Sequence, residues 1–229
     1  MKKSVGIIIP AFNEENAIAE VLREIPSGYA GEIVVVDNNS TDNTGEKARQ
    51  SGVTVLREVQ KGYGAACLKG ILYFMNKENP PDIIVFIDAD HSDYPEQLPD
   101  LIKPIIESGC DLVIGSRRLG LAEKGSMTPQ QIFGNRLATR LIWILYRHRF
   151  TDLGPFRAIR FDRLIEIGMK DMNYGWTVEM QVKAVKRKLK CCEVAVNYRR
   201  RIGFSKVSGT LKGTIMAGTK IIYTIFKYL

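Results

Sequence analysis

The sequence predicts an α/β fold in which helices cover both faces of a mostly parallel sheet. Short apolar runs rich in Val and Ile, of the kind that form fully buried strands, alternate along residues 1–118 with longer segments of helical periodicity. Polar and acidic residues follow four of these runs. In parallel sheets, ligands bind at the carboxyl ends of the strands, so the polar residues there point to a binding site.

The first half contains five expected strands, each short, apolar and largely β-branched. They lie at Val5–Ile9, Ile33–Val36, Val53–Leu56, Ile83–Ile87 and Leu112–Ile114. Helices are expected between them. Apolar residues with a period near 3.6 predict a helix at Glu14–Ile25, a capping segment predicts one at Asn43–Ser51, and further helices are expected at Gly62–Asn76 and Pro95–Ser108. Asn13 is a possible N-cap of the first helix, and Ser40 begins a capping segment before the second.

After Arg118 the alternation is less regular. Residues 119–128 form a glycine-containing loop, either a lid or a plain surface loop. The pattern then predicts, in order, a helix at Gln131–Arg147, an extended segment at Asp152–Ile159, a helix at Trp176–Lys188, a strand at Val194–Tyr198 and one or two helices within Ser208–Tyr228.

The composition is that of a soluble globular protein, with 229 residues of which 45% are apolar and 25% charged. The net charge of +8 is unevenly distributed, because residues 183–229 hold twelve of the 33 basic residues and one of the 25 acidic residues. Such a basic region suits phosphate groups, anionic lipid headgroups or nucleic acid, and equally a solvated surface.

The four cysteines and two histidines have no zinc-binding spacing. The adjacent pair Cys191–Cys192 is typical of a reduced, intracellular protein rather than of a disulfide framework. No signal peptide is expected before the first strand, and lysines interrupt the apolar tail 211–229, so a membrane-spanning helix is not expected there.

The strongest chemical pattern is Asp88-Ala89-Asp90, directly after the expected strand Ile83–Ile87. A hard divalent cation prefers oxygen ligands, and Mg²⁺ is usually held by one or two carboxylates together with substrate phosphates. The D-x-D step by itself is also a common turn. Its position at the end of a buried strand favours a metal site.

Other strand ends carry polar residues too. They are Asn13 and Glu14, Asp37 and Asn38, and Ser116 and Arg117. The segment from Lys61 to Gly64 is a glycine-rich start of a helix, but it lacks the full pattern of ATP-binding or dinucleotide-binding loops.

In their order along the chain, the motifs I-P-A-F-N-E-E, V-V-V-D-N-N-S-T-D, G-Y-G-A-A, D-A-D and G-S-R resemble glycosyltransferase family 2, which has the GT-A fold. The motifs D-L-G-P-F-R, G-W-T-V-E and Y-R-R-R-I-G-F-S-K, which begin at residues 152, 175 and 198, look like the dolichyl- and polyprenyl-phosphate mannosyl- and glucosyltransferase branch. The resemblance implies one GT-A domain over residues 1–229. Residues 1–118 would be its nucleotide-sugar half, 119–206 its acceptor half and 207–229 its amphipathic C-terminal helices.

The motifs and the resemblance together give the expected site. The expected donor-binding residues are Pro10, Ala11, Asn13, Glu14, Asp37, Asn38, Lys61, Gly64, Asp88, Ala89 and Asp90. The expected acceptor- and phosphate-binding residues are Arg117, Arg157, Trp176, Glu179, Arg200, Arg201 and Lys206. Trp176 has a strong alternative as a core residue.

The implied cofactor is Mg²⁺ or Mn²⁺, held by Asp88 and Asp90, with Asp90 the better direct ligand. Family members often carry D-A-D-L-Q, whereas Ser92 stands here in place of the glutamine. Ser92, Asp93 or water would therefore complete the metal shell.

The implied reaction is the inverting transfer of a hexose from a UDP-glucose- or GDP-mannose-type donor, with Asp90, Asp152, Arg117 and Arg201 as the expected catalytic residues. A cation and arginines would stabilise the departing diphosphate. A polyprenyl phosphate is already anionic and needs no base, and its product would be a β-linked lipid-phosphate sugar. A hydroxyl of a soluble or oligosaccharide acceptor needs a carboxylate base, for which Asp152, Glu179 and Asp93 are candidates.

A lipid acceptor places the protein in the cytoplasm, peripherally on the cytoplasmic face of the membrane, with residues 136–149 and 211–229 as interfacial helices. Both segments equally suit packing on the domain, on a second copy or on a small membrane partner. Nucleic-acid binding is not expected, because basic charge does not explain the acidic strand ends. Sugar-phosphate nucleotidylyltransfer would place a glycine-rich loop after the first strand, where this chain has Pro10-Ala11-Phe12.

Overall fold

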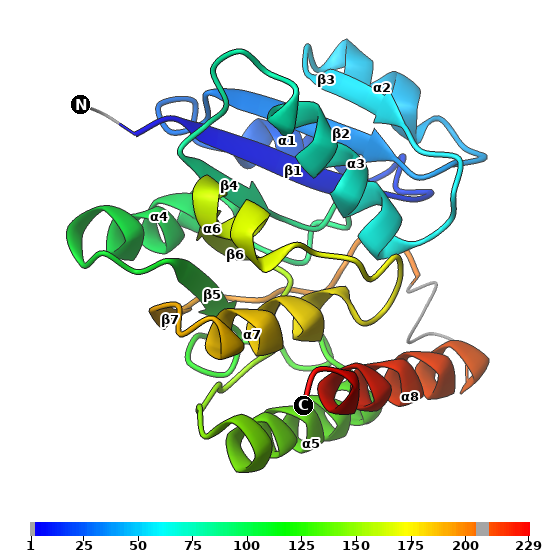
Figure 1. Cartoon of the computed structure of the whole chain (residues 1–229). Coiled ribbons are helices and arrows are strands. Elements are labelled where there is room, and N and C mark those ends of the chain that lie inside the picture. The colour runs from blue at the N-terminus through cyan, green and yellow to red at the C-terminus, as the bar shows by residue number, and fades with distance from the viewer. Residues whose placement is uncertain (1–2, 205–210) are drawn as a thin grey trace.

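The computed structural model describes residues 3–204 and 211–229, and a seven-stranded sheet runs through this part of the chain (Figure 1). The strand order is β3-β2-β1-β4-β6-β5-β7. The strands are β1 (Val5–Ala11), β2 (Glu32–Asp37), β3 (Thr54–Arg57), β4 (Ile83–Phe86), β5 (Leu112–Ser116), β6 (Arg157–Arg160) and β7 (Cys191–Ala195). Only β6 is antiparallel to its neighbours β4 and β5. The predicted mostly parallel α/β sheet is therefore confirmed.

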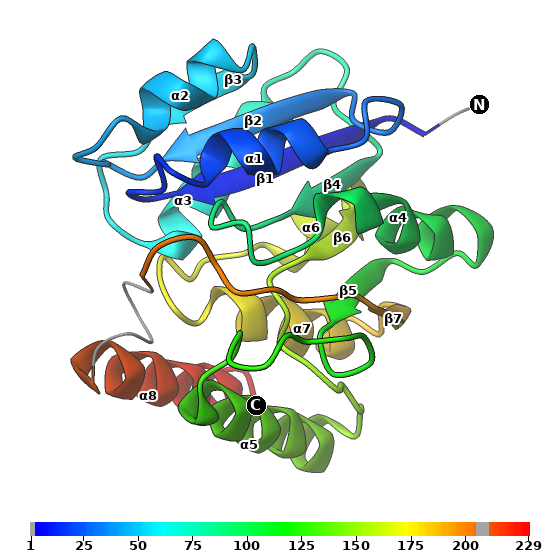
Figure 2. The same ribbon diagram turned by 180° about the vertical axis from the view of Figure 1, so that it is seen from behind.

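Helices cover both faces of the sheet. They are α1 (Ile18–Glu24), α2 (Thr44–Gln50), α3 (Tyr63–Met75), the short 3₁₀ helix η1 (Pro95–Gln97), α4 (Leu98–Glu107), α5 (Pro129–Tyr146), α6 (Phe161–Ile167), α7 (Trp176–Lys186) and α8 (Leu211–Lys227). Helices α3, α6 and α7 lie on one face (Figure 1), and α1, α2 and α4 on the other (Figure 2).

Each buried strand sends alternate side chains to opposite faces of the sheet. In β1, Ile8 belongs to the core under α3 and α7, whereas Ile7 and Ile9 belong to the core under α1 and α4. All three side chains are fully buried. A strand that is buried on both faces needs apolar residues at every position, which explains the unbroken apolar runs in the sequence.

Helices α5 and α8 lie against each other and against α7, at one end of the molecule (Figures 1 and 2). Thr128 and Gln131 form a capping box at the start of α5, and the helix ends at Arg147 in a left-handed conformation. The Tyr146 hydroxyl donates to the carbonyl oxygen of Ile225 and so links the two helices. The expected C-terminal helical region is one helix from Leu211, and residues 208–210 lie outside the described residues.

Three local expectations were wrong. The first helix begins at Ile18 rather than Glu14, and Asn13 is not its N-cap. Asn13 has a positive φ of 54°, and its side-chain oxygen accepts a hydrogen bond from the Thr41 amide, so it joins two loops. The last strand, β7, precedes the expected segment by three residues because it pairs with β5. Helix α6 was not expected from the sequence.

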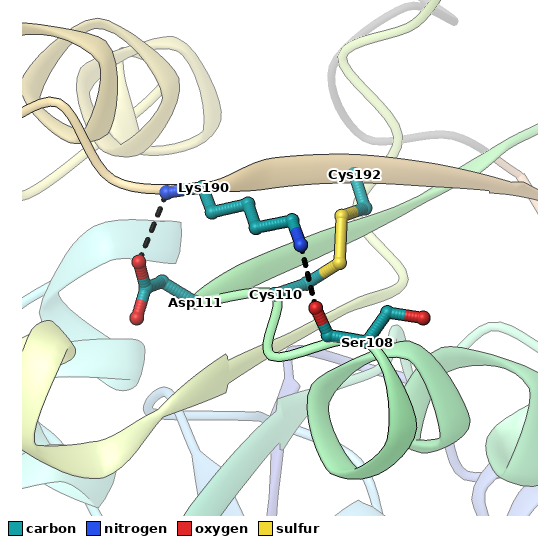
Figure 3. The surroundings of a disulfide bond; sticks show 5 residues. All are labelled: Ser108, Cys110, Asp111, Lys190 and Cys192. Atoms are coloured by element: carbon teal, nitrogen blue, oxygen red, sulfur yellow. Dashed lines mark hydrogen bonds between the residues drawn. A yellow bond between two sulfur atoms is a disulfide. The ribbon is translucent and has the colours of Figure 1, made fainter.

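The expectation of a reduced protein is also wrong, because Cys110 and Cys192 form a disulfide (Figure 3). Cys110 lies just before β5 and Cys192 lies on β7, and parallel pairing of these strands brings the two Cα atoms to 6.2 Å. Next to the disulfide, the Lys190 side chain donates to the Ser108 carbonyl oxygen at 2.6 Å (Figure 3). Because 82 residues separate the two cysteines, the local sequence around each one does not indicate that they pair.

Candidate active site

The carboxyl ends of β1, β2 and β4 lie at one edge of the sheet, because these strands are adjacent and parallel. Asp88 and Asp90 follow β4 at this edge. The Tyr63 hydroxyl at the start of α3 donates to Asp88 Oδ1 at 2.9 Å. Burial, together with the negative charge of Asp90, raises the pKa of Asp88 to about 7. Two neighbouring carboxylates in a desolvated place favour a positively charged ligand.

Asp90 is 7% exposed and is held by its own turn. Its Oδ1 accepts the Ser92 amide at 3.0 Å and also the Ser92 hydroxyl. Its Oδ2 lies 3.0 Å from Arg201 Nη1. Arg201 Nη2 donates to Glu14 Oε1 at 2.7 Å, so one guanidinium bridges the acids that follow β4 and β1.

Asp93 has an unusual environment. Its carboxyl is 1% exposed, and neither oxygen has a hydrogen-bond partner within residues 3–204 and 211–229. Burial and the charges of Asp88 and Asp90 raise the pKa of Asp93 well above its ordinary value. A buried carboxyl without partners is costly, and its orphaned oxygens mark a place where a cation or a donor group would be favourable.

Arg117 and Asp152 form a buried pair across the loops after β5 and before β6. The Arg117 Nε and Nη2 atoms donate to Asp152 at 2.8 Å each, and the Arg117 amide donates to the same carboxylate at 2.9 Å. Burial opposes the charge of Arg117, but the hydrogen bonds and charge of Asp152 outweigh it and raise the pKa of the guanidinium. Arg117 also stacks over the Tyr198 ring at 5.0 Å. Asp152 is therefore paired with Arg117 in this structure.

The other expected donor-site residues gather near the ends of β1 and β2. Pro10 and Ala11 end β1, Asp37 ends β2 and accepts the Ser40 amide at 2.9 Å, and Lys61 lies over the Phe12 ring at 5.7 Å. Ala89 is buried between the two aspartates of the D-x-D step.

Two residues expected at the donor site have contacts within the fold. The Asn38 side chain donates to the carbonyl oxygens of Glu58 and Gln60 and accepts from the Gly62 amide, so it fixes the loop before α3. A Cβ at Gly64 would lie 2.0 Å from the Asp171 carbonyl oxygen. The close approach of the segment between α6 and α7 therefore explains the glycine at position 64.

Three expected acceptor residues are buried in the structure, and each makes contacts within the fold. Trp176 is 1% exposed and packs edge-to-face on Phe86. Arg157 is equally buried and donates to the carbonyl oxygens of Leu153, Gly154 and Thr177.

Glu179 is the third of these residues and is fully buried. It accepts from the amides of Lys170 and Asp171 and from the Tyr228 hydroxyl, and Lys183 Nζ lies 2.7 Å away. The hydrogen bond from Tyr228 therefore links the end of the chain to α7.

The arginine cluster is divided between different places. Arg200 is exposed and donates to the Lys124 carbonyl oxygen in loop 119–128. Arg199 donates to the backbone carbonyl oxygens of His91 and Asp93, whereas the Arg201 guanidinium contacts the Asp90 carboxylate. Lys206 lies outside the described residues. Sequence reasoning missed Tyr63 because nothing in the G-Y-G pattern shows where its hydroxyl points.

A comparison with protein families decides which group the chain belongs to. The model described as glycosyl transferase family 2 matches residues 6–168. The chain is a member of glycosyl transferase family 2.

Several relatives of this family 2 member match most of its length. An uncharacterized glycosyltransferase of Mycobacterium bovis is 36% identical over 222 residues, which cover 93% of this chain and 94% of the relative. The undecaprenyl-phosphate mannosyltransferase of Micrococcus luteus is 30% identical, with 90% of this chain and 88% of the relative covered. The dolichol-phosphate mannosyltransferase of Pyrococcus furiosus is 29% identical, with 98% and 64% covered.

A solved structure supports the GT-A fold of this family 2 glycosyltransferase. It is the glucosyl-3-phosphoglycerate synthase of Mycobacterium tuberculosis in complex with Mn²⁺, uridine diphosphate and phosphoglyceric acid. The TM-score is 0.78 at 22% identity, and the match covers 99% of this chain and 78% of that chain. At this identity the likeness shows the fold alone.

Two further features of the family 2 member concern metal and membrane. Within residues 3–204 and 211–229, no group of three or more His, Cys, Asp or Glu side chains is arranged to hold a metal ion. Asp88 and Asp90 are two neighbouring carboxylates that follow β4. In the same residues, no helix combines the length and the apolar run that crossing a bilayer requires.

Proposed function

We propose that this glycosyltransferase moves a hexose, with inversion, from a UDP- or GDP-sugar to a polyprenyl phosphate. Relatives that match most of this chain are named for undecaprenyl phosphate and dolichol phosphate, which supports a lipid phosphate as the acceptor.

The observation that carries the proposal is the state of the three carboxylates suited to activate a hydroxyl acceptor. Asp152 is occupied by the guanidinium and amide of Arg117, and it is 1% exposed. Glu179 is fully buried among its own partners, and Asp93 is buried as well. A base must reach the proton that it removes. A phosphate acceptor requires no such group, because its oxygen is already anionic.

The donor site is proposed at Asp88 and Asp90, with Mg²⁺ or Mn²⁺ as the cofactor. The proposal of a cation rests on the available oxygen ligands. They are two adjacent desolvated carboxylates, and the oxygens of Asp93, which have no hydrogen-bond partner among the described residues, lie nearby. When bound, the cation would neutralise negative charge that develops on the leaving diphosphate. Ser92 already donates its hydroxyl to Asp90, so we propose that it orients this carboxylate rather than binding the metal.

Arginine side chains provide the remaining positive charge. Arg201 contacts Asp90 and is 26% exposed, so a diphosphate beside Asp90 would lie within its reach. Arg117 is fixed by Asp152 and by the Tyr198 ring, and such a preorganised charge stabilises a transition state without reorganisation.

Contact with a membrane surface follows from a lipid acceptor. Helix α5 exposes Phe133, Trp143 and Ile144 together with Arg136 and Arg140. Helix α8 exposes Ile215, Met216, Tyr223 and Phe226 beside it. Apolar side chains next to basic ones are typical of helices that lie at the headgroup level of anionic membranes. We propose that the α5–α8 pair forms this contact, on the cytoplasmic face.

The test uses purified protein, Mn²⁺, labelled UDP-glucose or GDP-mannose, and undecaprenyl phosphate in detergent. The expected product is a labelled lipid that partitions into organic solvent and releases its sugar in mild acid. Asp90→Asn should lower its formation at least about 100-fold, whereas the exposed Asp100→Asn should not. Label found only in a water-soluble glycoside would favour the soluble or oligosaccharide acceptor instead.

A further inference from the structure

We infer that Arg201 competes with the divalent cation for Asp90, so that the cation binds well only together with the diphosphate of the donor. This inference rests on the proposed function, and it deepens that proposal by giving the order in which the site is filled. Its starting observation is that Arg201 provides positive charge beside Asp90.

The contacts of Arg201 support this assignment. One guanidinium nitrogen lies 3.0 Å from Asp90 Oδ2, and the other donates to Glu14 Oε1 at 2.7 Å. The backbone is fixed as well, because the Ile202 amide donates to the Asp90 carbonyl oxygen at 3.0 Å. The arginine is thus fastened to the same turn whose carboxylate is the expected metal ligand.

One donor atom of Arg201 has no partner. Its Nε is buried and makes no hydrogen bond within the part of the chain that the structure describes. A buried N–H group without an acceptor is costly, because it has lost its hydrogen bonds with water. The oxygens of a diphosphate are suitable hydrogen-bond acceptors. A bound nucleotide-sugar would therefore provide a partner for this N–H group.

Charge determines the order of binding. Arg201 compensates part of the negative charge of the Asp88–Asp90 turn and of Glu14. A divalent cation that arrives alone meets this arginine as a like charge close to the same carboxylate, and that repulsion weakens its binding. A diphosphate that binds together with the cation supplies negative charge to both the cation and Arg201. Binding of nucleotide and of cation are then coupled, and the coupling is reciprocal.

The neighbouring arginine provides a matched control. Arg200 is exposed and donates to the Lys124 carbonyl oxygen, while its amide donates to Glu123, so it is fastened to loop 119–128. It is the same residue type one position away, and none of its hydrogen bonds goes to the acidic turn. Removal of its charge should leave the cation affinity unchanged.

The test measures Mn²⁺ binding by electron paramagnetic resonance of the free ion, with and without UDP. The wild type should bind Mn²⁺ weakly alone and at least about tenfold more tightly with UDP. In Arg201→Met, Mn²⁺ alone should bind about tenfold more tightly than to the wild type, and the gain from UDP should shrink. Arg200→Met should match the wild type, and Arg201→Lys, which keeps the charge, should remain weak for Mn²⁺ alone.

The outcomes separate the inference from the proposed function. If the wild type binds Mn²⁺ and UDP together but Arg201→Met does not bind Mn²⁺ alone more tightly, the competition is refuted. If the wild type binds neither Mn²⁺ nor UDP, the proposed donor site itself fails. Near-ultraviolet circular dichroism verifies folding, and Arg201→Gln, which retains a hydrogen-bond donor without the charge, repeats the test if the methionine variant unfolds.

Discussion

Replacement of Asp152 by asparagine tests whether this carboxylate positions Arg117 or removes a proton from an acceptor. The side chains of Asp152 and Arg117 are 1% and 12% exposed, and two guanidinium nitrogens and one amide donate to the carboxylate. Removal of one partner from a buried ion pair costs about 3–5 kcal/mol, because the other charge is left uncompensated. The amide of asparagine retains one acceptor, so we expect a loss of about 3 kcal/mol in the free energy of unfolding.

For a domain of this size, 1 kcal/mol corresponds to about 2–4 °C, so Tm should fall by about 6–12 °C in scanning calorimetry. The matched control is Asp162→Asn. Asp162 accepts two hydrogen bonds from Arg160, but its side chain is 56% exposed. An exposed pair of this kind contributes less than about 1 kcal/mol.

A catalytic base would give the opposite pattern. Its loss should lower kcat by about 10²–10⁴-fold and leave Tm unchanged. An Asp152→Asn protein with the wild-type Tm and a kcat lowered at least 100-fold would therefore refute the positioning role. A double-mutant cycle with Arg117→Gln checks the pairing itself, since the two losses of stability should then be clearly less than additive.

Three further predictions concern packing and thiols. Gly64→Ala places a Cβ 2.0 Å from the Asp171 carbonyl oxygen, so it should lower the free energy of unfolding in urea by about 1–3 kcal/mol. Gly218→Ala has open space around it and should not lower this free energy. Equal stabilities of the two variants would contradict this packing. Because of the disulfide, thiol titration of the denatured, unreduced protein should find two free thiols, and a result of four would disprove the bond. Burial, with nearby Asp111 and Glu193, raises the pKa of Cys191 from 9.0 to about 12, so its alkylation at pH 8.5 should be about a thousandfold slower than in denatured protein, and equal rates would contradict the shift.

The strands of the first half were predictable to within about two residues. For β1, β4 and β5 the reason is burial on both faces, which demands an unbroken apolar run. The second half follows weaker rules. The expected extended segment Asp152–Ile159 overlaps β6, but α6 begins at Phe161 directly after this strand, and no Gly or Pro marks the boundary. The disulfide was unpredictable for another reason: the pairing of β5 with β7 brings Cys110 and Cys192 together, and nothing in their local sequence shows this.

In the candidate site, too, some positions were predictable from the sequence and others were not. The positions of Asp37, Asp88 and Asp90 at one edge of the sheet were predictable, because adjacent parallel strands bring their carboxyl ends to the same edge. Glu179 and Arg157 have the residue types of a phosphate or sugar site, but the fold uses both to satisfy buried backbone groups. A charged residue looks the same in the sequence whether its partner is a ligand or a carbonyl oxygen of the chain itself. Only the tertiary contacts distinguish these two cases.

The three consecutive arginines show why charge counting along a sequence misleads at a site. In extended chain, successive side chains point to opposite sides, so residues two apart share a side. Arg199 stacks over Tyr94 at 4.4 Å and donates to the His91 carbonyl oxygen, and Arg201 contacts Asp90, so both face the acidic turn. Arg200, between them, turns to loop 119–128. A run that looks like one basic patch is thus divided into a structural anchor, a loop contact and a single arginine placed against the expected metal ligand. It follows that neutralising each arginine in turn should give three different defects, and that only the third should alter the affinity of the empty site for a cation.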